Sequence, residues 1–287
     1  MDAPHSQVFF PSNFQELFSA WSRFPDAVPF AGGTCLIRGF PAGGSGMSEL
    51  PALPKNILSL DRIDELKRIT RTERYLEIGA MVSLNDIIAL GKSIPEALSK
   101  TLNGIAGPQV RNLATAGGNI CSAGTPFGGI DIAAPMTALD ARYELRTAFQ
   151  NRWISALRFS SFGSSALAPQ ELLTRIRMPL EHWNYTVCRK FHSRDLGGET
   201  GGVMVFIAKN EKNLLTDIRI VFAGSCLLRD KDSEGFLKGK KLPLDHKDAV
   251  HYREMWSAYL SGMEKPGPML KAKLINCVES CVLGLAD

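Results

Sequence analysis

Two stretches of this sequence decide its fold: FAGGTCLI at positions 30–37 and RNLATAGGNI at positions 111–120. Each places a glycine pair at the end of an extended segment and follows it with a small polar residue and then apolar ones. Glycine pairs let backbone N–H groups converge on an anion, because no Cβ stands in the way. Two such nests, 85 positions apart, suit the two phosphates of one pyrophosphate, with side-chain hydrogen bonds from Thr34 and Asn119. Spacing alone also fits two ordinary tight turns.

Composition limits the class of protein. The chain has 287 residues, of which 45% are apolar and 22% charged, as in globular proteins rather than disordered or fibrous ones. The 33 basic and 29 acidic residues give a net charge of +4, too even for a nucleic-acid-binding polycation. The longest apolar stretch near the middle, 203–208, is too short for a membrane span, and the start lacks the basic region of a signal peptide. We expect a cytoplasmic protein.

Several catalytic signatures are absent from the sequence. It contains no P-loop, no GxGxxG, no GxSxG nucleophile elbow and no HExxH, which argues against a self-contained hydrolase, kinase or zinc enzyme. The six cysteines are scattered, and only Cys277 and Cys281 lie close together. A lone CxxxC is a weak metal signal, so we predict free thiols in a reducing compartment and no metal site.

Hydrophobic periodicity predicts a mixed chain. A helix begins at Phe14, capped by Ser12 with Gln15 three residues on, and ends before Pro25. Glycine and proline make 38–54 and 107–129 irregular. The predicted strands are 28–30, 56–60, 74–78, 143–146, 172–178, 185–191, 202–208 and 218–222. The other predicted helices are a short one after Ser83 and those at 94–102, 132–139, 247–260 and 269–285.

A family resemblance adds to this pattern. AGGTCL (31–36) and RNLATAGGNIC (111–121) resemble the two flavin-binding signatures of the FAD-carrying subunit of molybdenum hydroxylases, the xanthine dehydrogenase and carbon monoxide dehydrogenase type. Further similar pieces follow in the family's order, over about positions 9 to 285. They are LEIGAMVSL (76–84), ALDA (138–141), ELLTRIRMP (171–179), KFHSR (190–194), FAG (222–224) and LKGK (237–240).

The resemblance implies an α+β fold. A two-part FAD-binding domain of the PCMH or vanillyl-alcohol-oxidase type would occupy 1–168, with subdomains at about 1–57 and 58–168. A C-terminal flavoprotein domain of antiparallel sheet with helices would occupy 169–287.

The resemblance also implies cofactor-binding residues and no catalytic residue on this chain. Asp131 would hold the FAD ribose, the backbone of Leu173 would meet the flavin ring, and Lys190 would lie close to it. The alternatives are a helix cap for Asp131, after a loop two or three residues longer than the family pattern, and a solvated strand lysine for Lys190. The remaining residues, expected at or near the FAD diphosphate, are Ala31, Gly32, Gly33, Thr34, Cys35, Leu36, Ile37, Thr115, Ala116, Gly117, Gly118, Asn119 and Ser122.

By resemblance, the chain is an oxidoreductase subunit in a heterotrimer. A large molybdopterin-binding subunit would oxidise the substrate, and two-iron two-sulfur clusters on a small subunit would carry electrons to this chain's FAD. FAD would then pass them to NAD or another acceptor. The chain itself has no four-cysteine iron–sulfur pattern. Two alternatives stay open: a stand-alone FAD oxidoreductase of the same fold, and a non-enzymatic assembly subunit that has lost FAD.

Overall fold

The computed structural model describes residues 7–38, 53–122, 131–162 and 166–285. The chain divides into two compact units. Unit 1 comprises Met1–Ile94, Ile105–Gly129 and Asp140–Leu180, and unit 2 comprises Pro95–Gly104, Ile130–Leu139 and Glu181–Asp287. Unit 2 thus takes two short segments from the first half of the chain. The division into domains 1–168 and 169–287 follows sequence signatures rather than contacts and stays a prediction.

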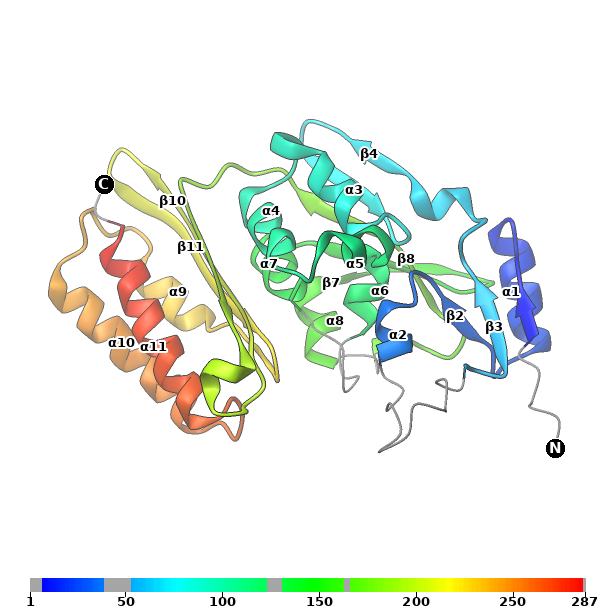
Figure 1. Ribbon diagram of the computed structural model, residues 1–287. Helices are drawn as coiled ribbons and strands as arrows, with labels where there is room; N and C mark the ends of the chain where they lie inside the picture. The colour runs from blue at the N-terminus through cyan, green and yellow to red at the C-terminus, as the bar shows by residue number, and fades with distance from the viewer. Residues whose placement is uncertain (1–6, 39–52, 123–130, 163–165, 286–287) are drawn as a thin grey trace. The chain divides into compact units, whose positions relative to one another are not determined.

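Unit 1 begins with a parallel three-stranded sheet. Its strands are β1 (Gln7–Phe9), β2 (Val28–Phe30) and β3 (Asn56–Ser59), in the order β1-β3-β2. Helix α1 (Phe14–Arg23) packs against β3 (Figure 1). Its cap lies one residue later than predicted: the Asn13 side chain accepts from the Glu16 N–H at 2.9 Å, and Glu16 accepts from the N–H of Ser12. These two reciprocal bonds satisfy amide donors at the start of the helix.

A five-stranded antiparallel sheet forms the centre of unit 1, in the order β4-β5-β8-β6-β7. The strands are β4 (Ile69–Arg71), β5 (Tyr75–Gly79), β6 (Arg142–Arg146), β7 (Asn151–Ser155) and β8 (Leu172–Pro179). The middle strand, β8, is buried over most of its length, which explains its apolar Leu172, Leu173 and Ile176. Next to its start, the Glu171 carboxylate lies 2.6 Å from the guanidinium of Arg152.

Short helices complete unit 1. They are α2 (Thr34–Arg38), η1 (Asp64–Lys67), α3 (Leu84–Ala89), η2 (Gly91–Ser93), α5 (Pro108–Leu113), α6 (Ala116–Cys121) and α8 (Ala156–Phe162). The irregular stretch predicted for 107–129 is therefore wrong as far as Cys121. Pro108 at the first position of α5 and the Thr115 cap of α6 start helices that the glycine pair obscured. Of the predicted irregular stretches 38–54 and 107–129, residues 39–52 and 123–129 lie outside the described residues, and Arg38 belongs to α2.

Unit 2 is built on a four-stranded antiparallel sheet in the order β12-β11-β10-β9. The strands are β9 (Tyr185–Phe191), β10 (Gly202–Glu211), β11 (Leu214–Ala223) and β12 (Leu227–Leu228). The helices are α4 (Glu96–Asn103), α7 (Ala133–Ala138), η4 (Ser193–Leu196), α9 (Lys231–Leu237), α10 (His246–Ser261) and α11 (Pro268–Leu283). The predicted α+β class and the antiparallel sheet with helices are confirmed.

Helices cover both faces of this sheet. In β10, Met204 and Phe206 belong to the core that α10 and α11 complete, while Val203 and Val205 point to the other face, where α7 packs (Figure 1). Burial on both faces makes this stretch a continuous apolar run instead of an alternating one. Among the described residues, no helix is long and apolar enough to cross a membrane.

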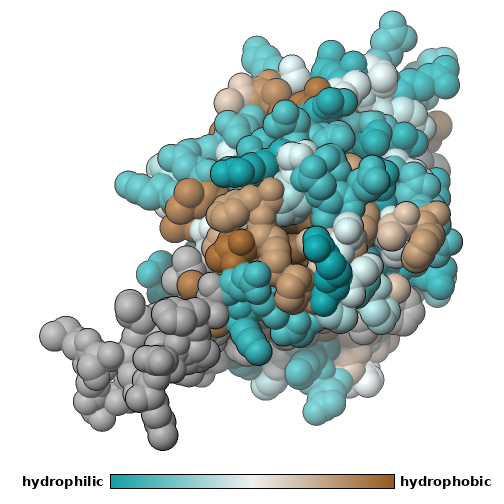
Figure 2. All heavy atoms as spheres, turned by 90° about the vertical axis from the view of Figure 1, so that its right-hand side faces the viewer, coloured by the Kyte–Doolittle hydropathy of each residue, from teal (hydrophilic) through white to brown (hydrophobic). Residues whose placement is uncertain are grey.

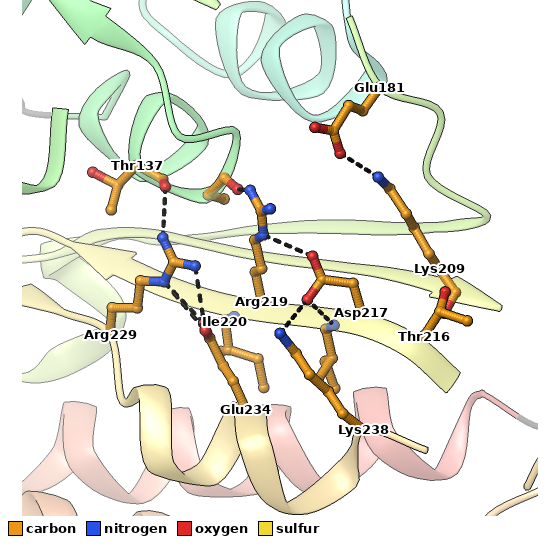
Figure 3. Close-up of polar contacts among 12 residues, drawn as sticks. Thr137, Glu181, Lys209, Thr216, Asp217, Arg219, Ile220, Arg229, Glu234 and Lys238 are labelled. Atoms are coloured by element: carbon orange, nitrogen blue, oxygen red, sulfur yellow. Dashed lines mark hydrogen bonds and ion pairs between the residues drawn. The ribbon is translucent and has the colours of Figure 1, made fainter. Parts of the chain in front are cut away.

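Arginine side chains tie the end of α7 to unit 2 by hydrogen bonds to its backbone carbonyl oxygens (Figure 3). The Arg229 guanidinium donates to the Thr137 carbonyl oxygen at 3.0 Å and pairs with the Glu234 carboxylate at 3.0 Å. Arg219 donates to the carbonyl oxygen of Ala138 at 2.7 Å. The Arg229 and Glu234 side chains are 6% and 5% exposed, and burial raises the pKa of Glu234 although Arg229 opposes the shift. The carbonyls at the end of α7 are thereby satisfied from β11 and from Arg229.

We predict that Arg229→Met lowers the free energy of unfolding by about 3–5 kcal/mol, because it leaves the Glu234 carboxylate buried and unpaired. Denaturant unfolding of the full chain measures the loss. The matched control is Arg253→Met, because Arg253 is 50% exposed where it pairs with Glu279, and its loss should stay below about 1 kcal/mol. Equal losses in the two variants would contradict the prediction.

Glu171 should make stability depend on pH. The hydrogen bond from Arg152 is the first cause that lowers the pKa of Glu171 below its ordinary 4.5. The pair with Arg152 therefore stabilises the fold fully above pH 4.5. This stabilisation is lost as the pH falls through the lower pKa that Glu171 has in the folded chain. At neutral pH, thermal unfolding should show that the free energy of unfolding of wild type exceeds that of Glu171→Gln by about 1 kcal/mol. The difference is modest because the Arg152 side chain is 43% exposed. The two melting curves should converge in acid; a constant gap would refute this role.

Candidate cofactor site

One pocket of unit 1 brings the two glycine loops together. It measures 380 Å³ and lies where β2 gives way to α2 and where α5 gives way to α6. Its lining residues are Pro29, Ala31, Gly32, Gly33, Thr34, Cys35, Leu36, Ala114, Thr115, Gly118, Asn119, Cys121 and Ser122. Most of the residues predicted from the two signatures thus share a single pocket. Pro29, Ala114 and Cys121 were not predicted as site residues, although Ala114 and Cys121 lie within the second signature and Pro29 directly precedes the first.

The first loop needs its glycines for two different reasons. A Cβ on Gly32 would stand 1.7 Å from the carbonyl oxygen of Leu113, so only glycine permits this approach of the two loops. Gly33 has a φ of +68°, which side-chain-bearing residues rarely adopt, and a Cβ there would also meet the Phe30 ring at 2.4 Å. Both positions therefore exclude larger residues.

The same loop offers backbone donors. Outside the helix and strand ladders, no hydrogen bond among the described residues uses the amides of Gly32, Gly33 or Thr34. The first turn of α2, which begins at Thr34, leaves further amides without helical acceptors. These N–H groups border the pocket and can donate to an anionic ligand.

The second loop does not form the expected nest of free amides. The Gly117 N–H donates to the carbonyl oxygen of Ala80 at 2.8 Å, and the Gly118 N–H donates to the Thr115 hydroxyl at 3.1 Å. The N–H of Asn119 donates to the Thr115 carbonyl oxygen at 2.9 Å. The glycine pair lies inside α6, where Gly117 packs against Ala80, so its amides are used by Ala80 and by the Thr115 cap.

In the second loop, Asn119 places a polar side chain at the pocket, whereas the backbone amides of this loop are already hydrogen-bonded. Its side-chain oxygen is buried and has no hydrogen-bond partner within the described ranges, yet the residue lines the pocket. A buried carboxamide oxygen without a partner is costly, so the site accommodates a ligand with a donor there. The backbone carbonyl oxygen of Asn119, a different atom, accepts a hydrogen bond from the Ser122 hydroxyl at 2.7 Å, which fixes the end of α6.

Thiols also border this pocket. Cys35 and Cys121 both line it, one from each loop. Burial raises the pKa of Cys121 to about 12, so this thiol stays neutral and unreactive near neutral pH. Ile37 lies in α2, and Ala116 is buried in α6.

Three further predicted residues lie outside the two glycine loops, whereas Ile37, Ala116 and Gly117 belong to the loops but are not among the described lining residues of the pocket. Leu173 is buried in β8 of unit 1, where it pairs with Leu145 of β6. Asp131 and Lys190 belong to unit 2 and bind each other: the Lys190 ammonium lies 2.6 Å from the Asp131 carboxylate and donates to the carbonyl oxygen of Gly104 at 3.0 Å. Lys190 lies on β9, as the alternative interpretation has it, but its side chain is 30% exposed and bonded within unit 2.

Comparison with known proteins identifies a family over the part of the chain that holds the pocket. The family described as "FAD binding domain in molybdopterin dehydrogenase" matches residues 4–181, which include both glycine loops. The chain is 30% identical to the glyceraldehyde dehydrogenase medium chain of Sulfolobus acidocaldarius over 221 residues, 75% of this chain and 74% of the relative. It is 36% identical to the carbon monoxide dehydrogenase medium chain of Afipia carboxidovorans over 160 residues, 54% of this chain and 51% of the relative.

Other relatives are much longer than this chain. The match to probable aldehyde oxidase 3 of Oryza sativa subsp. japonica is 28% identical and covers 69% of this chain but only 16% of the relative.

A solved structure shares the fold. Quinoline 2-oxidoreductase of Pseudomonas putida 86 matches with a TM-score of 0.77 and 21% identity, over 99% of this chain and 96% of the matched chain. Fold, pocket and family match agree, and the chain belongs to the family of FAD-binding domains of molybdopterin dehydrogenases.

Proposed function

We propose that this chain is the FAD-binding electron-transfer subunit of a molybdopterin-dependent oxidoreductase. The observation that carries the proposal is the pocket in which the amides of Gly32 and Gly33, which have no acceptor among the described residues, lie beside the side chain of Asn119, whose carboxamide nitrogen can donate as well. A diphosphate needs several hydrogen-bond donors at close range, and glycine backbone provides them without steric hindrance.

The pocket fits this cofactor. The amides of Gly32, Gly33 and Thr34 would donate to the diphosphate oxygens, and the Thr115 hydroxyl and Asn119 carboxamide would bond from the second loop. FAD, when bound, supplies the redox chemistry, because it accepts and releases electrons while the protein binds and orients it. The neutral thiol of Cys121 leaves that redox chemistry undisturbed.

The proposal also includes the three predicted residues outside the pocket, in the roles that the family resemblance implies. The backbone of Leu173 would meet the flavin ring, Asp131 would hold the ribose, and Lys190 would lie near the flavin. Because Asp131 and Lys190 form an ion pair, they would act on the cofactor as a nearly neutral unit.

Partner chains would supply the rest of the electron path. Two relatives are named medium chains, which supports a subunit placed beside a large and a small one. A molybdopterin-binding large subunit would oxidise the substrate, and iron–sulfur clusters on a small subunit would carry the electrons to FAD. NAD or another acceptor would then receive them in the cytoplasm.

Exposed apolar side chains support contacts with other proteins. Phe10 is 53% exposed beside β1, and Phe149 is 98% exposed between β6 and β7. Figure 2 shows apolar side chains gathered among hydrophilic ones on the face of unit 1 that carries α1 and β1. Exposed patches of this kind often mark interaction surfaces.

Gly33→Ala should weaken FAD binding about tenfold or more, because the side chain disturbs the loop whose amides face the diphosphate. The strain of a left-handed alanine should also lower the free energy of unfolding by about 1–2 kcal/mol. Gly91→Ala is the matched control: Gly91 has a φ of +57° in the same unit, a Cβ added to it would meet no atom within 4 Å, and it has no place in the pocket. FAD titration by flavin fluorescence and thermal unfolding measure the two effects.

The control should lose stability like Gly33→Ala but keep its FAD affinity. Equal FAD affinity in the two variants would remove the first glycine loop from the site.

A second experiment tests the subunit role. The purified chain should bind FAD, release it intact on acid denaturation, and fail to oxidise aldehydes or N-heterocycles. Adding the iron–sulfur and molybdopterin partners, co-expressed from neighbouring reading frames, should reduce the bound flavin when substrate is supplied. Absorbance at the flavin bands follows this reduction.

Substrate turnover by the chain alone, free of molybdenum and iron, would favour the stand-alone oxidoreductase instead. A folded chain that never takes up FAD would favour the assembly subunit.

A further inference from the structure

A second pocket, in unit 2, opens onto a thiol that the cofactor site does not use. It measures 420 Å³ and lies between the end of β9 and one face of α11, with Cys277 in its lining. Cys281 follows one helical turn later, and both cysteines are half-buried against the core of unit 2. In the part of the chain that the structure describes, no third ligand joins them to make a metal site.

The surroundings of Cys277 favour its thiolate. Arg189 of β9 lines the same pocket and brings a positive charge, and the Cys281 thiol is its neighbour one helical turn later. The Cys281 contact, and after it Arg189, lower the pKa of Cys277, although burial raises it. The contact with Cys277 raises the pKa of Cys281. One thiol of the pair is therefore prepared to be a nucleophile, and its neighbour holds a proton.

Other cysteines have the opposite environment. Burial raises the pKa of Cys121 to about 12, that of Cys188 to about 11, and that of Cys226 as well. Thiols of this kind react slowly because little thiolate is present. The difference among the cysteines should therefore be visible as selective modification of Cys277.

The pocket beside Cys277 is mostly cationic. Among its described lining residues, Arg189, Lys190 and Lys273 are basic and Asp195 is the one acid. The Lys190 charge is balanced by its ion pair in unit 2, whereas the Lys273 ammonium donates to the backbone carbonyl oxygen of Asp195 at 2.7 Å and has no acidic partner among the described residues. The remaining positive charge favours a small ligand that carries carboxylates.

Position on the helix permits the two sulfurs to join. Residues four apart on a helix have Cβ atoms roughly 5–6 Å apart, and a disulfide needs roughly 3.5–4.5 Å. Cys281 lies two residues before the end of α11 at Leu283, so closing the difference requires opening the last turn, which also carries the buried Val282. Few helical hydrogen bonds are lost at a helix end.

We propose that Cys277 and Cys281 form a redox-active dithiol, in which Cys277 attacks small acidic disulfides bound in the adjacent cationic pocket and Cys281 resolves the product.

The exchange balances as two substitutions at sulfur. The Cys277 thiolate attacks one sulfur of the small disulfide; a new S–S bond forms, the old one breaks, and one small thiolate leaves. The Cys281 sulfur then attacks Cys277, and the second small thiolate leaves with the proton of Cys281. The chain is oxidised by two electrons, and one small disulfide is reduced to two thiols.

The experiment compares three disulfides that differ in charge. The reduced full chain, loaded with FAD, is treated separately with oxidised glutathione (anionic), hydroxyethyl disulfide (neutral) and cystamine (cationic). Alkylation, digestion and mass spectrometry then locate each modified cysteine. Cys277 should react first, about tenfold faster with the anionic probe than with the cationic one, and added salt should shrink this ratio.

Variants separate the two roles. Cys281→Ser should stop at a stable mixed disulfide on Cys277, visible as the added mass of one small thiol, whereas wild type should lose only the mass of two hydrogen atoms. Lys273→Gln should reduce the preference for the anionic probe. Lys271→Gln should leave it unchanged, because Lys271 lies outside the described lining of the pocket.

Three results would overturn the proposal: faster reaction at another cysteine, rates independent of probe charge, or no trapped adduct in the folded Cys281→Ser chain. Bound FAD should stay constant throughout, so a failure here is distinct from a failure of the proposed function.

Discussion

The close approach of Gly32 to the Leu113 carbonyl is the contact on which the site depends. It leaves no room for a Cβ, and it joins the turn before α2 to the end of α5. From there backbone hydrogen bonds lead inward: Gly117 donates to Ala80 at 2.8 Å, and Ala80 donates to Thr174 at 3.0 Å. Thr174 follows Leu173 in the middle strand of the central sheet. The pocket is thus held by main-chain contacts from its rim to β8, which few substitutions can loosen.

The two loops offer different hydrogen-bonding groups because one glycine pair precedes a helix and the other lies within a helix. Gly32 and Gly33 precede a five-residue helix, so their amides stay outside any ladder and face the pocket. Gly117 and Gly118 lie within α6, so their amides are used by Ala80 and the Thr115 cap. Backbone donors therefore come from one side of the pocket and the Asn119 side chain from the other. A ligand held this way is fixed by geometry more than by charge, which suits a chain whose net charge is only +4.

Sequence patterns predicted the helices and strands whose formation depends on residues close together in the chain. The apolar runs at 185–191 and 202–208 appear as β9 and β10, since strand periodicity and hairpin spacing survive in an antiparallel sheet. The two signatures located most of the pocket lining as well. Helix α6 was missed because a glycine pair normally interrupts helices, and here the Thr115 cap outweighs that cost. No local rule could assign α4 and α7 to unit 2, because that depends on a sheet formed about a hundred residues later.

The pairing of Asp131 with Lys190 has the same long-range origin, and it changes how these residues should be understood. Gly104 ends the first segment that unit 2 takes from the first half of the chain, and Asp131 stands at the start of the second. Lys190 of β9 binds both, at 3.0 Å and 2.6 Å. Its ammonium therefore holds these two segments to the sheet of unit 2, whatever else it contacts. An electrostatic role toward a flavin would have to be shown with substitutions that preserve these two bonds, because losing them disturbs the unit that positions the charge.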